Sequence, residues 1–98
     1  MVTTTAGLDE IVRSSLARDR FLVDLGEGLV QGGVGLTAAH IGTRNGVGFV
    51  WLVTIRTTSG VVTVEADFPP ERRGDALGHE VCGELISRVL GWVRRVEA

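Results

Sequence analysis

Apolar and polar positions alternate most clearly along two segments, VGFVWLVTIR (47–56) and VVTVEADF (61–68), which are separated by four residues that end in Ser59-Gly60. This alternation predicts two strands that each place one face toward a core. A two-residue turn at Ser59-Gly60 joins them as an antiparallel hairpin. In that register the core-face pairs are Ile55 with Val64, Val53 with Ala66 and Trp51 with Phe68. Because one register sorts both strands into an apolar and a mostly polar face, the hairpin is well supported.

A third strand is predicted before this hairpin. Asn45-Gly46 is a strong signal for a tight turn, and it predicts a strand over about 35–44 that pairs with 47–56. A type I′ turn there places His40 opposite Trp51 and Ile41 opposite Val50. The pattern constrains this register less, because both faces of the segment are semi-apolar.

The residues before the sheet predict a helix. Within 8–25 the apolar residues first follow helical spacing, at Leu8, Ile11, Val12 and Leu16. The segment 21–25 either extends this helix to an end near Gly26 or forms a short strand, and we favour the helix. Residues 1–7 are predicted to be a flexible N-terminus.

Residues 26–35 read GEGLVQGGVG, in which five of ten are glycine. A dinucleotide-binding loop requires a strand before it, a helix that starts inside it, and an acidic residue about 20 positions on. Here a β-meander follows, and Val53 to Ile55 occupy the position of the acid. We therefore predict that 26–35 is a hinge between helix and sheet.

A second helix follows the sheet. Pro69-Pro70 ends the last strand, and the helix begins at Pro70 or, capped by Asp75, at Ala76. Its apolar band consists of Leu77, Val81, Cys82, Leu85, Ile86, Val89, Leu90, Trp92, Val93 and Val96. This band covers about half of the helix, wider than the usual stripe of about 100°, so we expect the helix to pack on the sheet and on something else. The predicted fold is one α+β domain over 1–98, in the order α-β-β-β-α, with the C-terminal helix on one sheet face.

Composition excludes some chemistry. The chain has 98 residues, a net charge of −2, no lysine, no tyrosine and a single cysteine, Cys82. A Walker-A loop and a Schiff base each need a lysine, so this chain alone supplies neither. One cysteine cannot form an intramolecular disulfide. The first residues do not resemble a signal peptide and no stretch resembles a membrane span, so we expect a cytoplasmic protein with no membrane partner.

Few residues are candidates for chemistry. His79 and Cys82 are spaced i, i+3 on the last helix, but a closed zinc site needs four ligands, and we predict neither a metal nor a cofactor. Glu65 and Asp67 share a strand face and, with His40, define one alternative, a small-molecule or metal site. No two or three groups are required to converge, so the sequence favours a binding protein over an enzyme.

Apolar residues at predicted surface positions indicate self-association or a protein partner. We expect an adaptor or chaperone-like interaction module that acts as a homodimer, with the interface at Ile41, Val50, Leu52, Leu90 and Trp92. Nucleic-acid binding is another alternative, because double-stranded-RNA-binding domains resemble this chain in element order. The same order also resembles that of small nucleoid-associated dimers and some secretion chaperones. In nucleic-acid binding the contacts would be Arg72, Arg73, Arg94 and Arg95. The negative net charge disfavours it, and element order alone does not establish a function.

Overall fold

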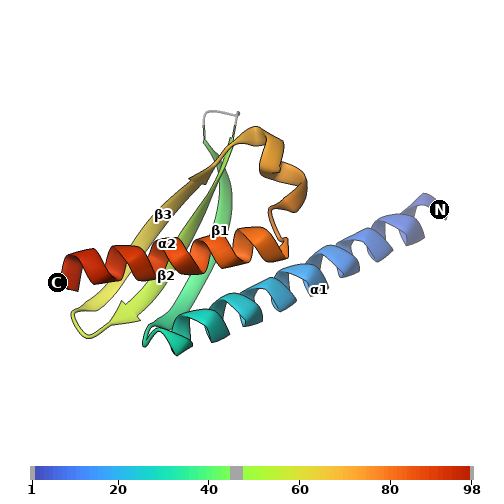
Figure 1. The fold of residues 1–98 in the computed structure, drawn as a ribbon. Coiled ribbons are helices and arrows are strands. Elements are labelled where there is room, and N and C mark those ends of the chain that lie inside the picture. Colours follow the sequence, from blue (N-terminus) through green and yellow to red (C-terminus); the bar gives the residue numbers. More distant parts are fainter. Residues whose placement is uncertain (1, 45–47, 98) are drawn as a thin grey trace.

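The structure is a computed structural model that describes the backbone of residues 2–44 and 48–97 and the side chains of 16–43 and 48–97. Its elements are α1 (Val2–Gln31), β1 (Gly35–Arg44), β2 (Gly48–Thr57), β3 (Gly60–Phe68), the 3-10 helix η1 (Pro70–Asp75) and α2 (His79–Glu97). The strands form one open antiparallel sheet in the order β1-β2-β3. Both helices lie on the same face of this sheet (Figure 1). The predicted α+β fold, α-β-β-β-α, is confirmed.

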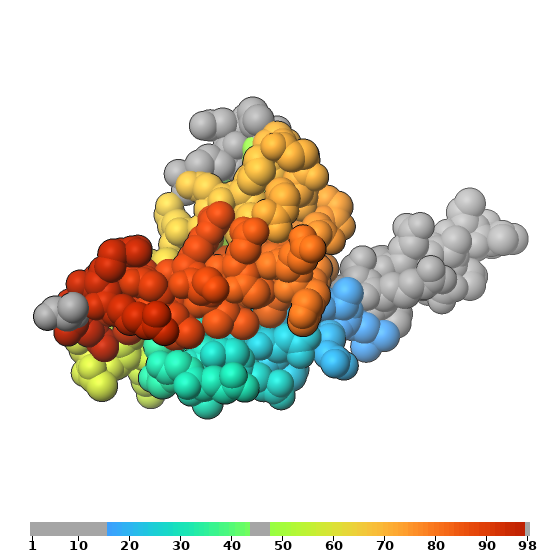
Figure 2. Space-filling model, viewed as in Figure 1, coloured from blue at the N-terminus to red at the C-terminus, as the bar shows by residue number. Residues whose placement is uncertain are grey.

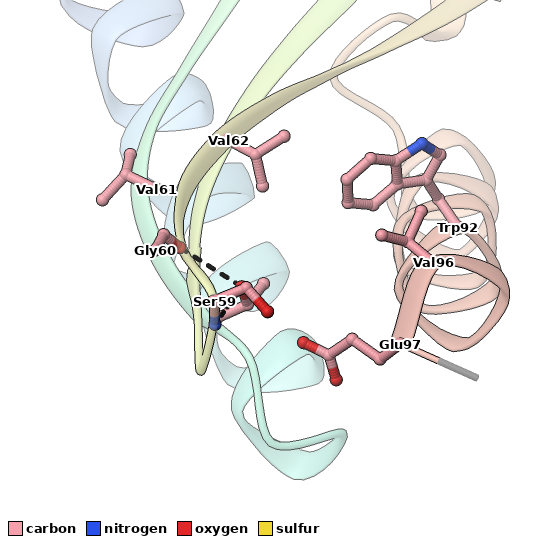
Figure 3. A pocket seen from close by; sticks show the side chains of 8 residues that line it. Ser59, Gly60, Val61, Val62, Trp92, Val96 and Glu97 are labelled. Carbon is pink, nitrogen blue, oxygen red and sulfur yellow. Dashed lines mark hydrogen bonds between the residues drawn. The ribbon is translucent and has the colours of Figure 1, made fainter.

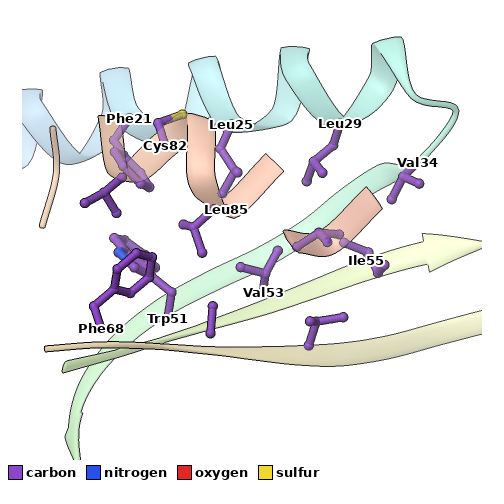
Figure 4. Close-up of a cluster of buried hydrophobic side chains, with 14 of the residues drawn as sticks. Phe21, Leu25, Leu29, Val34, Trp51, Val53, Ile55, Phe68, Cys82 and Leu85 are labelled. Carbon is purple, nitrogen blue, oxygen red and sulfur yellow. The ribbon is translucent and has the colours of Figure 1, made fainter. Parts of the chain in front are cut away.

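The hydrophobic core fills the space between the sheet and the two helices (Figure 4). The sheet contributes alternate residues of β2 and β3, and each helix contributes one side. The buried members from these four elements are Phe21, Leu25, Leu29, Phe49, Trp51, Val53, Ile55, Val64, Ala66, Phe68, Val81, Cys82, Leu85, Val89 and Val93. In the space-filling view, α2 and the C-terminal half of α1 lie side by side over this face (Figure 2).

The hairpin β2–β3 forms with its predicted faces but in a different register. Ile55 pairs with Val62, Val53 with Val64 and Trp51 with Ala66, two residues from the predicted partners. The turn is Thr58-Ser59, because Thr57 pairs with Gly60. Gly60 has φ 125°, a conformation that glycine adopts at little cost. A shift of two residues keeps every side chain on its face, so the hydrophobic pattern could not distinguish the two registers.

The strand β1 has the predicted bounds, but its predicted register is wrong by one residue. Ile41 pairs with Trp51, Gly42 with Val50 and His40 with Leu52. Ile41 therefore shares the helix-covered face and His40 the opposite face, the reverse of the prediction. A one-residue shift moves every side chain to the other face, and the semi-apolar segment did not specify which. The predicted turn at Asn45-Gly46 lies outside the described residues.

The helix α1 is longer than predicted at both ends. It begins at Val2, inside the segment predicted to be flexible, and it ends at Gln31, inside the predicted hinge 26–35. The glycines are accommodated because two of them face α2: a Cβ at Gly28 would overlap Ile86, and a Cβ at Gly32 would overlap Leu90. The hinge prediction is therefore wrong for residues 26–31, where the small residues let two helices pack closely.

The helix α1 ends in a short connection to β1. Gly33 has φ 81°, in the left-handed region that glycine adopts easily. The Val34 N–H donates a hydrogen bond to the Leu29 carbonyl (2.9 Å), a pattern typical of a helix C-terminus. Only Gly32 to Val34 separate the helix from the sheet, so this connection is tight.

The helix α2 begins later than either predicted start. Pro70 is the first residue of η1, and α2 starts at His79. Between them, the Gly78 N–H donates a hydrogen bond to the Asp75 carbonyl (2.7 Å). This path brings the Ala76 carbonyl to the indole Nε1 of Trp51 (3.1 Å). The predicted apolar band is buried where it faces the sheet, and its second contact is α1 of the same chain, through Ile86 and Leu90.

Candidate functional site

A small groove lies between the tip of the β2–β3 hairpin and the C-terminal end of α2. Its volume is about 150 Å³, and it is lined by Thr57, Ser59, Gly60, Val61, Val62, Trp92, Val96 and Glu97. Figure 3 shows Trp92 and Val96 of α2 facing Val62 of β3 across this space. The tight turn fixes the hairpin side, because the Thr57 hydroxyl donates to the Gly60 carbonyl (3.2 Å) and accepts from the Ser59 N–H (3.1 Å).

The groove is apolar with a polar edge. Val96 is 60% exposed, and Val62 and Trp92 are half-buried against the core. The side chain of Val61 points to the other sheet face (Figure 3). At the edge, the Thr58 hydroxyl donates to the Glu97 carboxylate (3.3 Å), which links the hairpin to the last turn of α2. The exposed apolar surface of this groove therefore consists of Val96 and part of Trp92.

A second groove follows the outer side of α1 next to the sheet edge. Its volume is about 500 Å³, and it is lined by Leu22, Val23, Gly26, Glu27, Val30, Gln31 and Leu36. The two valines are more than half exposed, and both leucines are half-buried. This groove is wide and shallow compared with the first, so it fits an elongated element better than a single side chain.

The five predicted interface residues lie on separate surfaces. Val50, 6% exposed, and the half-buried Leu52 lie on the sheet face opposite the helices. Ile41 lies on the helix-covered face, and Leu90 packs against α1 at Gly32. Only Trp92 lines a groove with exposed apolar neighbours. The sequence did not single out Val96 as a surface residue, although a valine in the final turn of a helix is a position where exposure is a reasonable expectation.

The arginines proposed for nucleic-acid contacts do not form one patch. The Arg72 guanidinium donates to Glu84 (2.9 Å) and lies 5.7 Å from the centre of the Phe68 ring. The hydrogen bond to Glu84 raises the pKa of Arg72. Arg73 donates to the Gly48 carbonyl (3.5 Å). Arg94 and Arg95 are exposed in the last turn of α2, where cations favour the helix dipole, about 15 Å along the helix from Glu84.

Arg88 completes the environment of Phe68. Its guanidinium lies 4.4 Å from the centre of that ring, donates to the Asp67 carbonyl (2.7 Å) and contacts Glu84 (3.5 Å). Phe68 stacks on its other neighbour, Phe49, with ring centres 5.0 Å apart. Two arginines, one carboxylate and one ring therefore join η1, β3 and α2, which gives Arg72 a structural role.

The groups of the proposed small-molecule site share one sheet face without converging. His40 and Glu65 both pair with Leu52, from opposite sides, so β2 separates them. Two strand spacings place their backbones about 10 Å apart. Asp67 lies two residues beyond Glu65 and pairs with Val50. His40 is exposed, and it pairs with Leu52 and not with Trp51, its partner in the predicted register.

His79 and Cys82, the candidate metal-ligand pair, differ in solvent exposure. His79 is exposed, while Cys82 is 5% exposed, and this burial, followed by the charge of Asp24, raises the pKa of the thiol. Among residues 16–43 and 48–97, no three His, Cys, Asp or Glu side chains are close enough to hold a metal ion.

Comparison of this chain with protein-family models, with curated proteins and with solved structures finds no match. In the part of the chain that the structure describes, neither helix combines the length and hydropathy of a membrane-crossing segment.

Proposed function

We propose that this chain is a cytoplasmic protein–protein interaction module, an adaptor or chaperone-like protein that acts as a homodimer without catalytic chemistry. The observation that carries the proposal is the groove in which the exposed Val96 and the half-buried Val62 flank the half-buried Trp92 (Figure 3). Tryptophan is enriched among the residues that contribute most to protein–protein affinity, especially where neighbouring contacts exclude water.

The size of the groove indicates what it binds. Sites for small molecules and cofactors usually enclose about 300–1,000 Å³, whereas this groove measures about 150 Å³. That volume accommodates one apolar side chain of a partner. The Thr58–Glu97 hydrogen bond at the edge would then belong to the polar rim that surrounds such a contact.

Cross-linking in cells tests whether a protein occupies the groove. A photo-reactive benzoylphenylalanine replaces Val96 and, as a matched control, the exposed Ser87 on α2 outside the groove. We expect the residue at position 96 to capture a protein that the residue at 87 does not. Equal capture at both positions would contradict the proposal, and a captured species that nuclease removes would favour the nucleic-acid alternative.

The captured protein then allows an affinity measurement. We expect Trp92→Ala to raise its Kd by about 30-fold or more, because truncating a central aromatic contact typically costs at least about 2 kcal/mol. Trp92→Phe should have a smaller effect. Circular dichroism and the melting temperature show whether each variant is folded, and a folded Trp92→Ala variant with an unchanged Kd would overturn the proposed site.

A further inference from the structure

The helix α1 has apolar residues on two opposite sides. Phe21, Leu25 and Leu29 are buried in the core. Leu16, Val23 and Val30 form an outer stripe in which the side chains are 63%, 54% and 65% exposed. A spacing of seven residues returns to the same side of a helix within about 20°, so these three side chains form a line about 21 Å long. Nothing in the described part of the chain covers this line.

The second groove lies beside the outer stripe. Leu22 and Leu36 line it, and Gly26 leaves a gap between Val23 and Val30. A Cβ at Gly26 would meet only Leu36, at an ordinary distance of 3.6 Å, so close packing inside the chain does not require this glycine. A ridge of valines beside a gap can pack against a copy of itself, with the ridge of each helix in the gap of the other.

Two charges beside the outer stripe are arranged for self-recognition. Arg20 and Glu27 are seven residues apart on the same flank, on either side of Val23. Glu27 is exposed, and the Arg20 guanidinium contacts Asp24 (3.4 Å) but has five N–H donors. In two antiparallel helices related by a twofold axis near Val23, Arg20 lies within one residue's rise of Glu27 of the second copy, and the reciprocal pair forms as well.

We propose that a second copy of this chain covers the outer stripe, with the two α1 helices antiparallel and their twofold axis near Val23. Leu16 then packs near Val30 of the second copy. A parallel pair is disfavoured because it places every residue level with its own copy, and the exposed Asp19, next to the stripe, would face another Asp19. The antiparallel arrangement separates those two carboxylates by about 12 Å along the helices.

This inference rests on the proposed function, since it names the surface of the proposed homodimer. The first test is the mass of the protein by sedimentation equilibrium. We expect the wild-type chain to be a dimer and Val23→Asp to raise the dimer Kd by about 30-fold or more, because the axis brings both new carboxylates together. Ser87→Asp, at an exposed position on α2 outside both grooves, should leave the dimer Kd unchanged.

A charge exchange tests the antiparallel register. Arg20→Glu alone and Glu27→Arg alone should each weaken the dimer by about tenfold, because each homodimer then contains two like-charged pairs. An equimolar mixture of the two variants should restore association, since every pair in the heterodimer has opposite charges. Failure of the mixture to associate more tightly than either variant would overturn this register.

Disulfide trapping gives a readout that does not depend on stability. Val23→Cys places two thiols next to the axis, and we expect oxidation to yield a covalent dimer. Ser87→Cys, the control at an exposed position outside both grooves, should form no covalent dimer under the same conditions. The native Cys82 is buried and should not react. Equal cross-linking of both variants would contradict the proposed surface.

The outcomes separate this inference from the proposed function. A wild-type monomer would overturn both the α1 interface and the homodimer, whatever the groove binds. A Val23→Asp variant that remains a tight dimer, with capture at position 96 unchanged, would overturn only the α1 interface. A dimer that Val23→Asp dissociates, with no specific capture at position 96, would overturn only the partner-binding groove.

Discussion

At the scale of single residues, Trp51 joins three parts of the fold. It is 1% exposed, its ring stacks on Phe21 of α1 with centres 4.7 Å apart, and its indole donates to the Ala76 carbonyl. A stacked pair contributes about 0.5–1.5 kcal/mol beyond area burial, and a hydrogen bond contributes a similar amount. One side chain thus fixes α1, β2 and the segment before α2 relative to one another.

Cys82 gives the chain a pH dependence that can be assigned to a single group. Its pKa is raised, chiefly by burial and then by Asp24, so the folded state retains the thiol proton at a pH where the unfolded chain loses it. We therefore expect the free energy of unfolding to fall as pH rises above about 8.5, the pKa of a free thiol. The chain contains no lysine and no tyrosine, so no other side chain titrates between about pH 9 and 11.

Urea titrations at pH 8 and pH 10.5 measure this effect. We expect the wild-type chain to lose stability between the two values and Cys82→Ala to lose less, although that variant is less stable at both. Equal losses in the two proteins would show that Cys82 does not cause the pH dependence.

At the scale of elements, Gly28 and Gly26 of α1 differ in whether the packing of α2 leaves room for a side chain. Gly28→Ala places a methyl group against Ile86, and overpacking of about 1–3 kcal/mol exceeds the gain of about 1 kcal/mol in helix propensity. We expect a net loss of about 1 kcal/mol in stability. Gly26→Ala meets Leu36 at an ordinary distance and should gain up to about 1 kcal/mol.

Urea denaturation of the two alanine variants checks the opposite signs. Ile86→Val removes the Cδ1 atom that the new methyl group would meet, so Gly28→Ala should cost less in an Ile86→Val background than in the wild-type chain. The same sign for Gly26→Ala and Gly28→Ala would contradict the proposed role of the glycines in helix packing.

At the scale of the whole molecule, the sheet has one strand with two neighbours and two edge strands. Both rows of β2 backbone groups are hydrogen-bonded, whereas one row each of β1 and β3 faces away from the sheet. We expect β2 amides to exchange with deuterium most slowly and the outward amides of β1 and β3 much faster. Exchange followed residue by residue by NMR measures this order. Slow exchange along one edge strand would indicate a dimer that extends the sheet, contrary to the α1 interface.

The sequence by itself determined the element order and the faces of β2 and β3. Alternation over two adjacent segments, in which one face is apolar throughout and the other mostly polar, indicates which side is buried. A shift of two residues leaves that assignment intact. The apolar band of α2 was likewise readable, because helical spacing repeats from Val81 to Val93. Trp92, the predicted interface residue that lines the groove at the end of α2, belongs to the broad edge of that band.

Only the tertiary structure decided the role of the glycine-rich segment and the face of β1. GEGLVQGGVG is a poor helix by local propensity. It is helical through Gln31 where Leu25 and Leu29 are buried in the core and Gly28 lets Ile86 of α2 pack closely. The face of β1 that is covered by the helices depends on whether His40 or Ile41 pairs with Trp51. Because β1 is semi-apolar on both faces, its sequence is compatible with either register. In the same way, Val23, Val61 and Val96 are exposed because the core lies on the other side of their elements. The pattern of one element alone does not specify that side.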